Sequence, residues 1–598
     1  MNVARKPHPV SSGACWLLAA VCALATLVVP ATGLAAATPC TAEAAQAAAP
    51  PGMTIGRIDD LNPALPAVPT GARAIDATGR TPSYCLVTGS VVTNPSTGKT
   101  ANFGVALPLT WSGRFLFTGC GGLCGSVFQS RPDDPRGGGF PADALAKGYA
   151  IAATDDGHAN RPVTHPFDAS WAITSPGVPN TDARIDYFHR AVHTVTEASK
   201  LLVQRWYSGE IAHSYFFGCS NGGREGMVEA TRYPTDFDGY VVGDPFFDVP
   251  GQILAGGAAL PVLKAGAFIP PALLALVNDT VRASCDALDG VEDGLIQNPG
   301  RCSFEPRSLI CKGGRPGRCL TQGQVDTLTA WLSAKKDEQG RVASFGFSVS
   351  DLYDASAPGA NLYAWVEGAG PPRKRAAPEP WGRSLAAQPP AWSSYDQAFK
   401  YLVYLDPSFD NNRVPAVDHR GIVSDDTLGR LVAQTDEASG DDPRALAPFL
   451  ASKRKLIMYH GYSDGFVNPF RTIRFYEDWA KLVGGYDALK RSARLFMVPG
   501  MYHCDGGPGP NTFDALGALE RWVEDGVAPE GIVATKYAQD DRSKRALRTM
   551  PLCSFPTQAR HPGRGDVNSA EAWSCAPNRD LLLVGPNGAA AGLDAPMH

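Results

Sequence analysis

The chain has 598 residues, of which 44% are hydrophobic and 19% are charged, and its formal net charge is −5. This charge is small for the length and no long basic run occurs, which argues against nucleic acid as a partner. The length exceeds that of one average domain, so we expect a core that carries a large insertion.

The first 37 residues have the pattern of a Sec-type signal peptide. Arg5 and Lys6 precede an uncharged stretch of 16 residues, 14–29, and three alanines end the segment at residue 37. That stretch is shorter than the roughly 20 residues of a membrane-spanning helix, and no comparable run occurs later. We therefore expect a secreted or periplasmic chain without a membrane partner.

Fourteen cysteines occur, and Cys15 and Cys22 lie within the expected signal peptide. The other 12 are an even number in a chain bound for an oxidising compartment, so up to six disulfides are expected.

The mature chain begins with short apolar runs and continues with a helical pattern at 186–207. Strands are expected at 84–93, 103–109, 114–118, 149–154 and 214–217, and later at 455–459 and 494–498. Strands that alternate with helices predict a mainly parallel sheet covered on both faces, which is an α/β fold.

Between about residues 246 and 450 the composition changes. Proline and glycine are frequent, cysteines cluster, and the alternation typical of strands is weak. We expect an inserted lid domain here, with a mobile surface loop at 368–380. The first core part then spans 38–245 and the second spans 451–598.

Ser220 stands at the centre of G-x-S-x-G in "YFFGCSNGGREG", residues 215–226. In α/β-hydrolases this motif is a sharp turn between a strand and a helix that exposes the serine hydroxyl, and its glycines let the flanking elements approach. A structural glycine turn is the alternative. The expected strand before and helix after the motif favour a nucleophile.

The same fold places an acid and a histidine, in that chain order, in loops after later strands. Asp464 follows one expected strand in "YHGYSDGFVNP", and His503 follows the next in "MVPGMYHCDGG". Each could be an ordinary loop residue, but their joint placement predicts a triad of Ser220, His503 and Asp464.

Two cysteines adjoin this predicted triad. Cys219 precedes Ser220, and Cys504 follows His503. If the serine and the histidine lie within hydrogen-bond reach, their neighbours are close enough for a disulfide. The alternative is that both cysteines have other partners.

These motifs resemble the tannase and feruloyl esterase family, which carries a Cys-Ser, Asp, His-Cys arrangement and includes a hydrolase of mono(2-hydroxyethyl) terephthalate. Further matches are "GYAIAATDDGH", "HRAVHTVTEASKLL" and "RYPTDFDGYVVGDP", so the resemblance covers nearly all of the mature chain. It implies an α/β-hydrolase core with a large lid.

Acyl transfer needs backbone N–H groups directed at an oxyanion. We expect one from Asn221 and another from Gly121 or Gly122 in "TGCGGLCG", residues 118–125. A glycine-rich loop is often only a turn, but this one follows an early strand as in the family. Cys120 and Cys124 depart from the family pattern and predict an extra disulfide in the loop.

The segment "CDALDGVEDGLI" places three carboxylates close together, with glycines between them. Oxygen ligands suit a hard cation, although the spacing is not that of an EF-hand. The resemblance implies a structural Ca²⁺ in the lid, and a solvated acidic turn is the alternative. The implied ligands are Asp286, Asp289 and Asp293, with the carbonyls of Val291 and Leu295.

The resemblance implies further disulfides and a substrate pocket. His460 matches a pocket-lining position, although a packed loop histidine is equally compatible, and Phe466 and Val467 are expected beside it. The cysteine pattern alone does not determine connectivity. The implied pairs are Cys40–Cys85, Cys285–Cys302, Cys311–Cys319 and Cys553–Cys575.

Together these features predict a secreted serine carboxylic ester hydrolase for small esters of aromatic acids, such as feruloyl or galloyl esters. A terephthalate-type monoester hydrolase is an alternative within the family. A peptidase or lipase on the same fold is disfavoured because the motifs extend beyond the triad. A calcium-dependent binding protein with a vestigial site is disfavoured because every triad residue is present.

Overall fold

The computed structural model describes residues 38–79, 81–128, 143–159, 166–313, 317–357 and 359–578. The chain divides after Ala37 into two units, and every described residue belongs to the larger one, which begins at Thr38. The expected signal peptide, with Cys15 and Cys22, lies outside the described residues.

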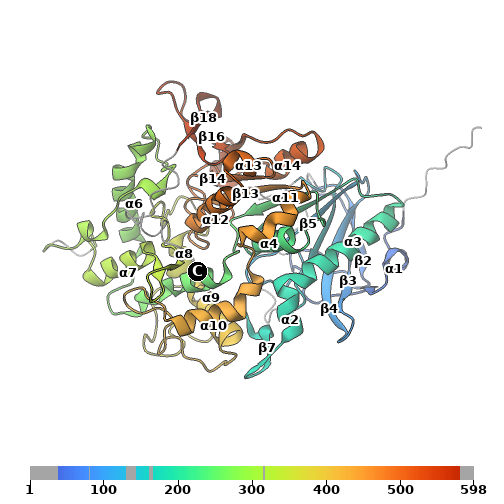
Figure 1. Ribbon diagram of the computed structural model, residues 1–598, viewed down its shortest axis with the longest axis horizontal. Helices are drawn as coiled ribbons and strands as arrows, with labels where there is room; N and C mark the ends of the chain where they lie inside the picture. The colour runs from blue at the N-terminus through green and yellow to red at the C-terminus, as the bar shows by residue number, and fades with distance from the viewer. Residues whose placement is uncertain are drawn as a thin grey trace, which may run out of the picture. The chain divides into compact units, whose positions relative to one another are not determined.

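A ten-stranded sheet forms the centre of the larger unit (Figure 1). It consists of β1 (Met53–Ile55), β2 (Ala72–Ile75), β3 (Tyr84–Asn94), β4 (Lys99–Pro108), β5 (Arg114–Thr118), β6 (Ala150–Thr154), β9 (His213–Cys219), β10 (Gly239–Gly243), β13 (Lys455–Gly461) and β14 (Ala493–Val498). Its order is β1-β3-β4-β6-β5-β9-β10-β13-β14, and β2 also pairs with β3. Pairing is antiparallel from β1 to β6 and parallel from β6 to β14.

The parallel part of the sheet is buried on both faces. Every residue of β6, β10 and β14 is buried, as expected for parallel strands between two helical layers. Neighbouring side chains of β9 belong to different hydrophobic cores. Phe216 packs with residues of α3 and α12, whereas Tyr215 packs with residues of α14. These helices are α3 (Ala191–Tyr207), α12 (Pro469–Leu482) and α14 (Ala515–Glu524).

The expected strands are all present, with small differences at their ends. β4 begins four residues before the expected 103–109 and ends one residue earlier, and β13 continues two residues past 459. The expected helix at 186–207 is interrupted, because Asp186–Arg190 forms a π turn between α2 (Thr181–Ile185) and α3. Such a turn inserts an extra residue without ending the helical path.

The chain leaves the sheet between β10 and β13, and the expected lid segment at 246–450 falls within this interval. Figure 1 shows its helices α6 and α7 on the opposite side of the unit from α3. The segment has a hydrophobic core of its own, which includes Leu274, Trp331 and Trp392. Its elements are α5 (Val249–Gly256), α6 (Pro271–Cys285), α7 (Gln322–Leu332), β11 (Lys335–Lys336), β12 (Val342–Ser344), α8 (Leu362–Val366), α9 (Pro390–Gln397), α10 (Asp425–Thr435) and α11 (Ala447–Ala451).

Short elements complete the described chain. Two hairpins follow α14, and one of them is linked to β14 by a bridge between Phe496 and Ser554. The remaining elements are α1 (Ala42–Ala48), β7 (Ile173–Ser175), β8 (Val178–Pro179), α4 (Asn221–Arg232), α13 (Tyr486–Leu489), β15 (Gly531–Tyr537), β16 (Ala546–Cys553), β17 (Thr557–Arg560) and β18 (Ser574–Pro577).

Six disulfides join cysteines in the described part of the chain, and each has the pairing that the sequence or the family resemblance led us to expect. They join residues 4 to 285 positions apart, so they connect local turns as well as distant parts of the fold. The pairs are Cys40–Cys85, Cys120–Cys124, Cys219–Cys504, Cys285–Cys302, Cys311–Cys319 and Cys553–Cys575.

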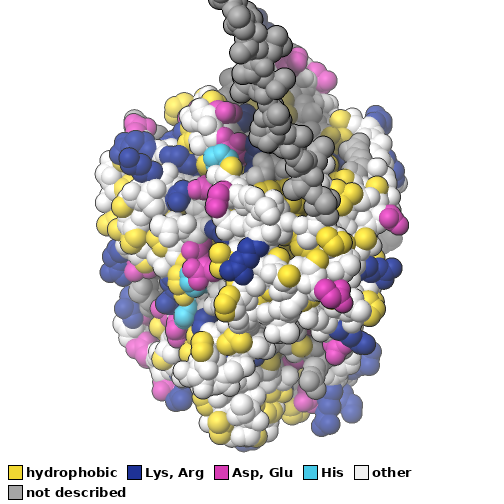
Figure 2. Space-filling model, turned by 90° about the vertical axis from the view of Figure 1, so that its right-hand side faces the viewer, with side chains coloured by type: hydrophobic (Ala, Val, Ile, Leu, Met, Phe, Trp, Pro, Cys, Tyr) yellow, Lys and Arg dark blue, Asp and Glu magenta, His cyan; other side chains and the backbone are white. Residues whose placement is uncertain are grey.

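Figure 2 shows the face of the molecule that bears α1 and α3, with acidic and basic side chains interspersed among isolated apolar ones. The described side chains on this face therefore form no extensive patch of one charge. Across the described ranges, no helix combines the length and the apolar composition that crossing a membrane requires.

Candidate active site

Ser220 lies on the sharp turn between β9 and α4. Its φ of 63° and ψ of −122° are a backbone conformation that non-glycine residues seldom adopt. Its N–H donates to the carbonyl of Gly243 at 3.0 Å. A Cβ atom on Gly218 would lie 2.3 Å from the carbonyl oxygen of Gly222, so the turn requires glycine there.

Asp464 and His503 lie in the loops that follow β13 and β14, and their side chains meet. Nδ1 of His503 is 2.7 Å from Oδ2 of Asp464. The other oxygen of Asp464 accepts hydrogen bonds from the N–H groups of Phe466 at 2.7 Å and Val467 at 2.9 Å. The loop backbone thus holds one oxygen, and the other is directed at the imidazole.

The electrostatics of this pair favour an ion pair. Burial alone raises the pKa of Asp464, but the charge of His503 and hydrogen bonds from His460 and His503 lower it to about 2. Burial lowers the pKa of His503, but the charge and hydrogen bond of Asp464, together with the charges of Asp244 and Asp505, raise it above the usual 6.5. Asp464 is therefore ionised at neutral pH and stabilises an imidazolium.

The Cys219–Cys504 disulfide joins the residue before Ser220 to the residue after His503. These residues are 285 positions apart, and the bond brings the serine turn and the histidine loop together. The N–H of His503 also donates to the carbonyl of Ala360 at 3.3 Å, so the segment between β10 and β13 contacts the site.

Asp244 is a fully buried carboxylate that the sequence analysis did not identify. It follows β10 with a φ of 34°. Its Oδ1 accepts from the N–H of Gly461 at 2.8 Å, and its Oδ2 accepts from the N–H of Cys504. Burial raises its pKa to about 6 against the opposing charge of His460. The sequence analysis did not predict β10, and the short apolar run before Asp244 in "RYPTDFDGYVVGDP" is the signal that could have identified both the strand and the carboxylate at its end.

His460 lies beneath the acid, fully buried. Its Nδ1 is 2.8 Å from the hydroxyl oxygen of Thr472, and its Nε2 is 3.2 Å from both Oδ2 of Asp464 and the carbonyl oxygen of Val467. Both ring nitrogens have partners inside the fold. These contacts favour a packed histidine over the pocket-lining position, although His460 lies within β13 and not in a loop.

Phe466 and Val467 lie in the same loop but in different environments. The ring of Phe466 stacks on the imidazole of His503, with centroids 5.3 Å apart, and also packs against Trp365 at 4.5 Å. Val467 is buried, with 3% of its surface exposed. Aromatic surface therefore adjoins the histidine on the side of Phe466 and Trp365.

The glycine-rich loop after β5 lies against the first turn of α4. A Cβ atom on Gly119 would be 2.6 Å from Cα of Gly222, so the two backbones touch. Gly122 has a φ of +63°, and a Cβ there would lie 2.2 Å from the carbonyl oxygen of Pro166. Asn221 is the first residue of α4, so its N–H has no acceptor within the helix.

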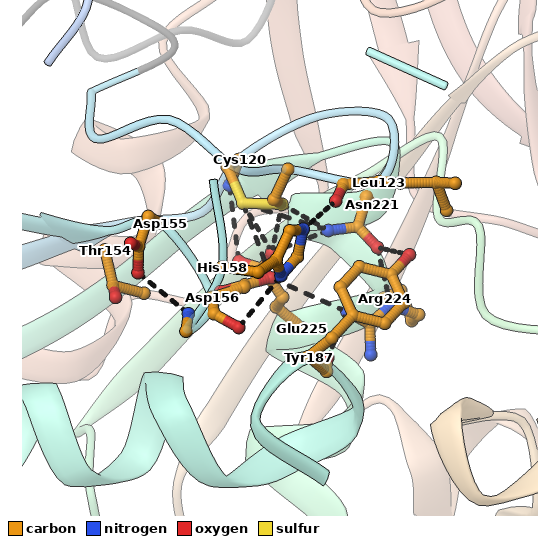
Figure 3. Close-up of a disulfide and its surroundings, with 12 residues drawn as sticks. Cys120, Leu123, Thr154, Asp155, Asp156, His158, Tyr187, Asn221, Arg224 and Glu225 are labelled. Atoms are coloured by element: carbon orange, nitrogen blue, oxygen red, sulfur yellow. Dashed lines mark hydrogen bonds and ion pairs between the residues drawn. A yellow bond between two sulfur atoms is a disulfide. The ribbon is translucent and has the colours of Figure 1, made fainter. Parts of the chain in front are cut away.

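Two buried carboxyl groups, Asp156 and Glu225, flank the Cys120–Cys124 disulfide (Figure 3). The sequence analysis did not single them out, although "TDDGH" and "GREG" contain them. They are 0% and 2% exposed. Burial raises the pKa of Glu225 to about 7, and burial together with Glu225 raises that of Asp156.

The acidic segment expected to bind Ca²⁺ forms the turn after α6. Each of its three carboxylates accepts backbone hydrogen bonds from the turn itself, as in compact loops that gather oxygen ligands. The N–H groups of Gly294, Val291 and Leu295 donate to Asp286, Asp289 and Asp293 at 2.9, 3.1 and 3.0 Å respectively.

The charges of this turn are only partly compensated. Burial, and then the other carboxylates, raise the pKa of Asp289 to about 6, and burial raises that of Asp293. Arg548 lies 3.3 Å from Oδ2 of Asp293, which accepts no hydrogen bond although it is buried. Carboxylates that raise one another's pKa are stabilised by a divalent cation, so the chemistry of these oxygen donors suits Ca²⁺.

Comparison with known proteins places this arrangement in a family. The model of the tannase and feruloyl esterase family matches residues 85–576. Mono(2-hydroxyethyl) terephthalate hydrolase from Piscinibacter sakaiensis is 31% identical over 537 residues, which cover 83% of this chain and 85% of that protein. A probable feruloyl esterase from Arthroderma benhamiae is 31% identical over 475 residues, or 79% of this chain and 81% of that protein.

A solved structure agrees with these matches. The crystal structure of feruloyl esterase B from Aspergillus oryzae superposes with a TM-score of 0.68 at 26% identity, covering 85% of this chain and 95% of that chain. The chain therefore belongs to the tannase and feruloyl esterase family and is a carboxylic ester hydrolase with an α/β-hydrolase fold.

Proposed function

We propose that the enzyme cleaves small esters of aromatic acids through an acyl-enzyme formed on Ser220. The observation that carries this proposal is the 2.7 Å contact between His503 and Asp464, combined with a disulfide that joins the neighbours of His503 and Ser220. These contacts support a Ser-His-Asp mechanism, in which an acid orients a histidine beside the serine.

In this mechanism Nε2 of His503 removes the proton from the Ser220 hydroxyl while the oxygen attacks the ester carbonyl. Nδ1–H of His503 donates to Asp464, whose low pKa keeps it ionised and able to stabilise the imidazolium. The imidazolium then protonates the leaving alcohol. Water, deprotonated by the same histidine, attacks the acyl group, and the imidazolium returns the proton to the Ser220 oxygen as the acid leaves.

The negative charge of the tetrahedral intermediate requires N–H donors. We assign one to Asn221, because its N–H begins α4 and the positive end of the helix dipole faces the turn. The second comes from Gly121 or Gly122, because the loop that carries them touches Gly222.

The aromatic preference is supported by the rings beside His503. Phe466 stacks on the imidazole and contacts Trp365, which also packs against Phe167 with centroids 5.8 Å apart. Flat aromatic surfaces favour a flat acyl group through stacking. The names of two relatives, feruloyl esterase and mono(2-hydroxyethyl) terephthalate hydrolase, both denote esters of aromatic acids.

A substrate panel tests this proposal. Purified enzyme is assayed with methyl ferulate, methyl gallate, mono(2-hydroxyethyl) terephthalate and a long-chain acyl ester, with Ser220→Ala as the control. We expect the highest kcat/KM with one of the first two. The terephthalate monoester, if preferred, would support the alternative suggested by the relative from Piscinibacter sakaiensis. A preference for the long acyl chain would contradict an aromatic pocket.

We also propose a structural Ca²⁺ in the turn after α6, held by Asp286, Asp289 and Asp293 with the carbonyls of Val291 and Leu295. The uncompensated charge of these carboxylates supports it. The ion would stabilise the segment between β10 and β13 and take no part in the chemistry. We further propose export of the chain with removal of residues 1–37, which N-terminal sequencing of the secreted protein tests.

A further inference from the structure

The loop that carries Gly121 and Gly122 and the helix that begins with Asn221 are separate in the sequence, so their relative position needs a physical connection. A backbone shift of about 1 Å between groups that act together can lower a rate by about a hundredfold. One side chain contacts both elements, and Figure 3 shows it beside the Cys120–Cys124 disulfide.

That side chain is Glu225, one turn after Asn221 on α4. Its Oε2 accepts a hydrogen bond from the N–H of Cys120 at 3.3 Å. Its Oε1 accepts one from the side-chain amide of Asn221 at 2.7 Å. The two oxygens of one buried carboxyl therefore reach the loop and the start of the helix.

The surroundings of Glu225 leave it little freedom. Oε1 lies 3.0 and 3.4 Å from the two sulfur atoms of the Cys120–Cys124 disulfide. The amide oxygen of Asn221 accepts from Nε of Arg224 at 2.6 Å and from the hydroxyl of Tyr187 at 2.9 Å. These contacts fix the orientation of the amide, so its nitrogen is directed at Glu225.

A second side chain, His158, also contacts the loop. Nε2 of His158 lies 2.8 Å from the carbonyl oxygen of Leu123, and burial lowers the pKa of this histidine to about 4, so it is neutral and donates from Nε2. His158 holds the loop to the segment after β6. Glu225 holds the loop to α4, together with the Asn221 amide, whose nitrogen lies 3.0 Å from Sγ of Cys124.

We propose that Glu225 is a positioning residue of the oxyanion hole, which holds the N–H groups of the loop and of Asn221 in register through Cys120 and the Asn221 amide. The inference rests on the proposed function, because it concerns the N–H donors assigned there. Asp156 assists, because burial and the charge of Glu225 raise its pKa, so that Asp156 retains a proton while Glu225 remains the acceptor.

Glu225→Gln tests this role, because glutamine has the same shape but offers one acceptor oxygen in place of two. An amide group would face either the Cys120 N–H or the Asn221 amide with another donor. We expect kcat to fall by about 10- to 100-fold with little change in KM, since the oxyanion is stabilised mainly in the transition state. The substrate is 4-nitrophenyl acetate, whose hydrolysis does not depend on an aromatic acyl preference.

Glu229→Gln is the matched control. Glu229 lies one turn further along α4, is 1% exposed, and has a pKa raised by burial, but its carboxyl faces Asp236 rather than the loop. We expect its substitution to leave kcat unchanged. If Glu225 had only a structural role, Glu225→Gln would behave like a destabilised control. Its folded fraction would fall, while kcat per folded molecule stayed at the wild-type value.

Asn221→Ala provides a second variant, because it removes the amide partner and keeps the backbone N–H. We expect a kcat loss similar to that of Glu225→Gln. Wild-type kcat in folded Glu225→Gln or, if that variant does not fold, in Asn221→Ala would overturn the inference. Failure of the wild-type enzyme on methyl ferulate, with activity on 4-nitrophenyl acetate retained, would contradict only the proposed substrate class.

Discussion

Oδ1 of Asp244 accepts a hydrogen bond from the backbone N–H of Gly461 at 2.8 Å, across 217 positions of the chain. Its other oxygen accepts from the N–H of Cys504, so one buried carboxylate joins the end of β10, the end of β13 and the histidine loop. It also lies close enough to His503 to help raise the pKa of that imidazole.

Asp244→Asn should therefore lower both stability and activity. One of the two buried hydrogen bonds is lost, at a cost of about 1.5–3 kcal/mol for a charged acceptor. The pKa of His503 should decrease, because a nearby negative charge is removed. Urea unfolding and the pH profile of kcat/KM measure the two effects. Asp238→Asn, before the other end of β10, is the control and should change stability alone.

Alanine substitutions of the three proposed triad residues should lower kcat by different amounts. Replacing Ser220 or His503 with alanine should lower kcat by about 10⁴- to 10⁶-fold, because the loss of either residue removes the effect of the whole triad. Asp464→Ala should lower kcat less. Circular dichroism should show folded protein in each case. Near-wild-type hydrolysis of an aryl ester by Ser220→Ala would show that the nucleophile is another residue.

The pH dependence should follow the raised pKa of His503. The imidazole must be neutral to act as a base, so kcat/KM should fall as the pH decreases through a midpoint above 6.5. In Asp464→Asn the residual activity should have its midpoint at lower pH, because the carboxylate that raises this pKa is gone. An unchanged midpoint would show that the titrating group is not His503.

The Cys219–Cys504 disulfide should affect catalysis as well as stability. Its sequence separation of 285 corresponds to about 5–6 kcal/mol in the chain-entropy treatment, against about 2–3 kcal/mol for Cys311–Cys319 with a separation of 8. Alanine at Cys219 and Cys504 should lower kcat per folded molecule, because the serine turn and the histidine loop lose their covalent link.

Alanine at Cys311 and Cys319 is the control for that comparison and should lower the Tm while kcat per folded molecule is kept. Peptide mapping of non-reduced protein checks the pairing itself. A free Cys219, or one joined to another cysteine, would contradict the covalent link.

The proposed Ca²⁺ should stabilise the fold. Added calcium should raise the Tm of metal-free protein and chelation should lower it, because the ion binds only the folded turn. Asparagine at Asp286, Asp289 and Asp293 together should abolish this dependence. A Tm that is the same with calcium and with chelator in the unsubstituted protein would exclude the site.

Much of the fold can be read from local sequence. The predicted buried strands are continuous apolar runs, and they appear where the sequence predicts them, with ends that shift by up to four residues. The buried strand β10 was not among the predicted ones. The turn at Ser220 is also local, because glycines must stand where the backbone of one element touches another. The adjacency of Cys219 to Ser220 and of Cys504 to His503 was sufficient to predict a disulfide across 285 positions.

The contacts of the polar groups around these residues depend on the tertiary structure alone. Asp244 meets Gly461 because β10 and β13 are neighbours in the sheet, a pairing that no local pattern encodes. In sequence, His460 matches a pocket-lining position of the family. Only the packing of Thr472 and Asp464 around it shows that the ring lies inside the fold. Glu225 is in sequence an ordinary helical glutamate. Its contacts with Cys120 arise because the sheet order brings β5 beside β9, which carries the loop onto the helix.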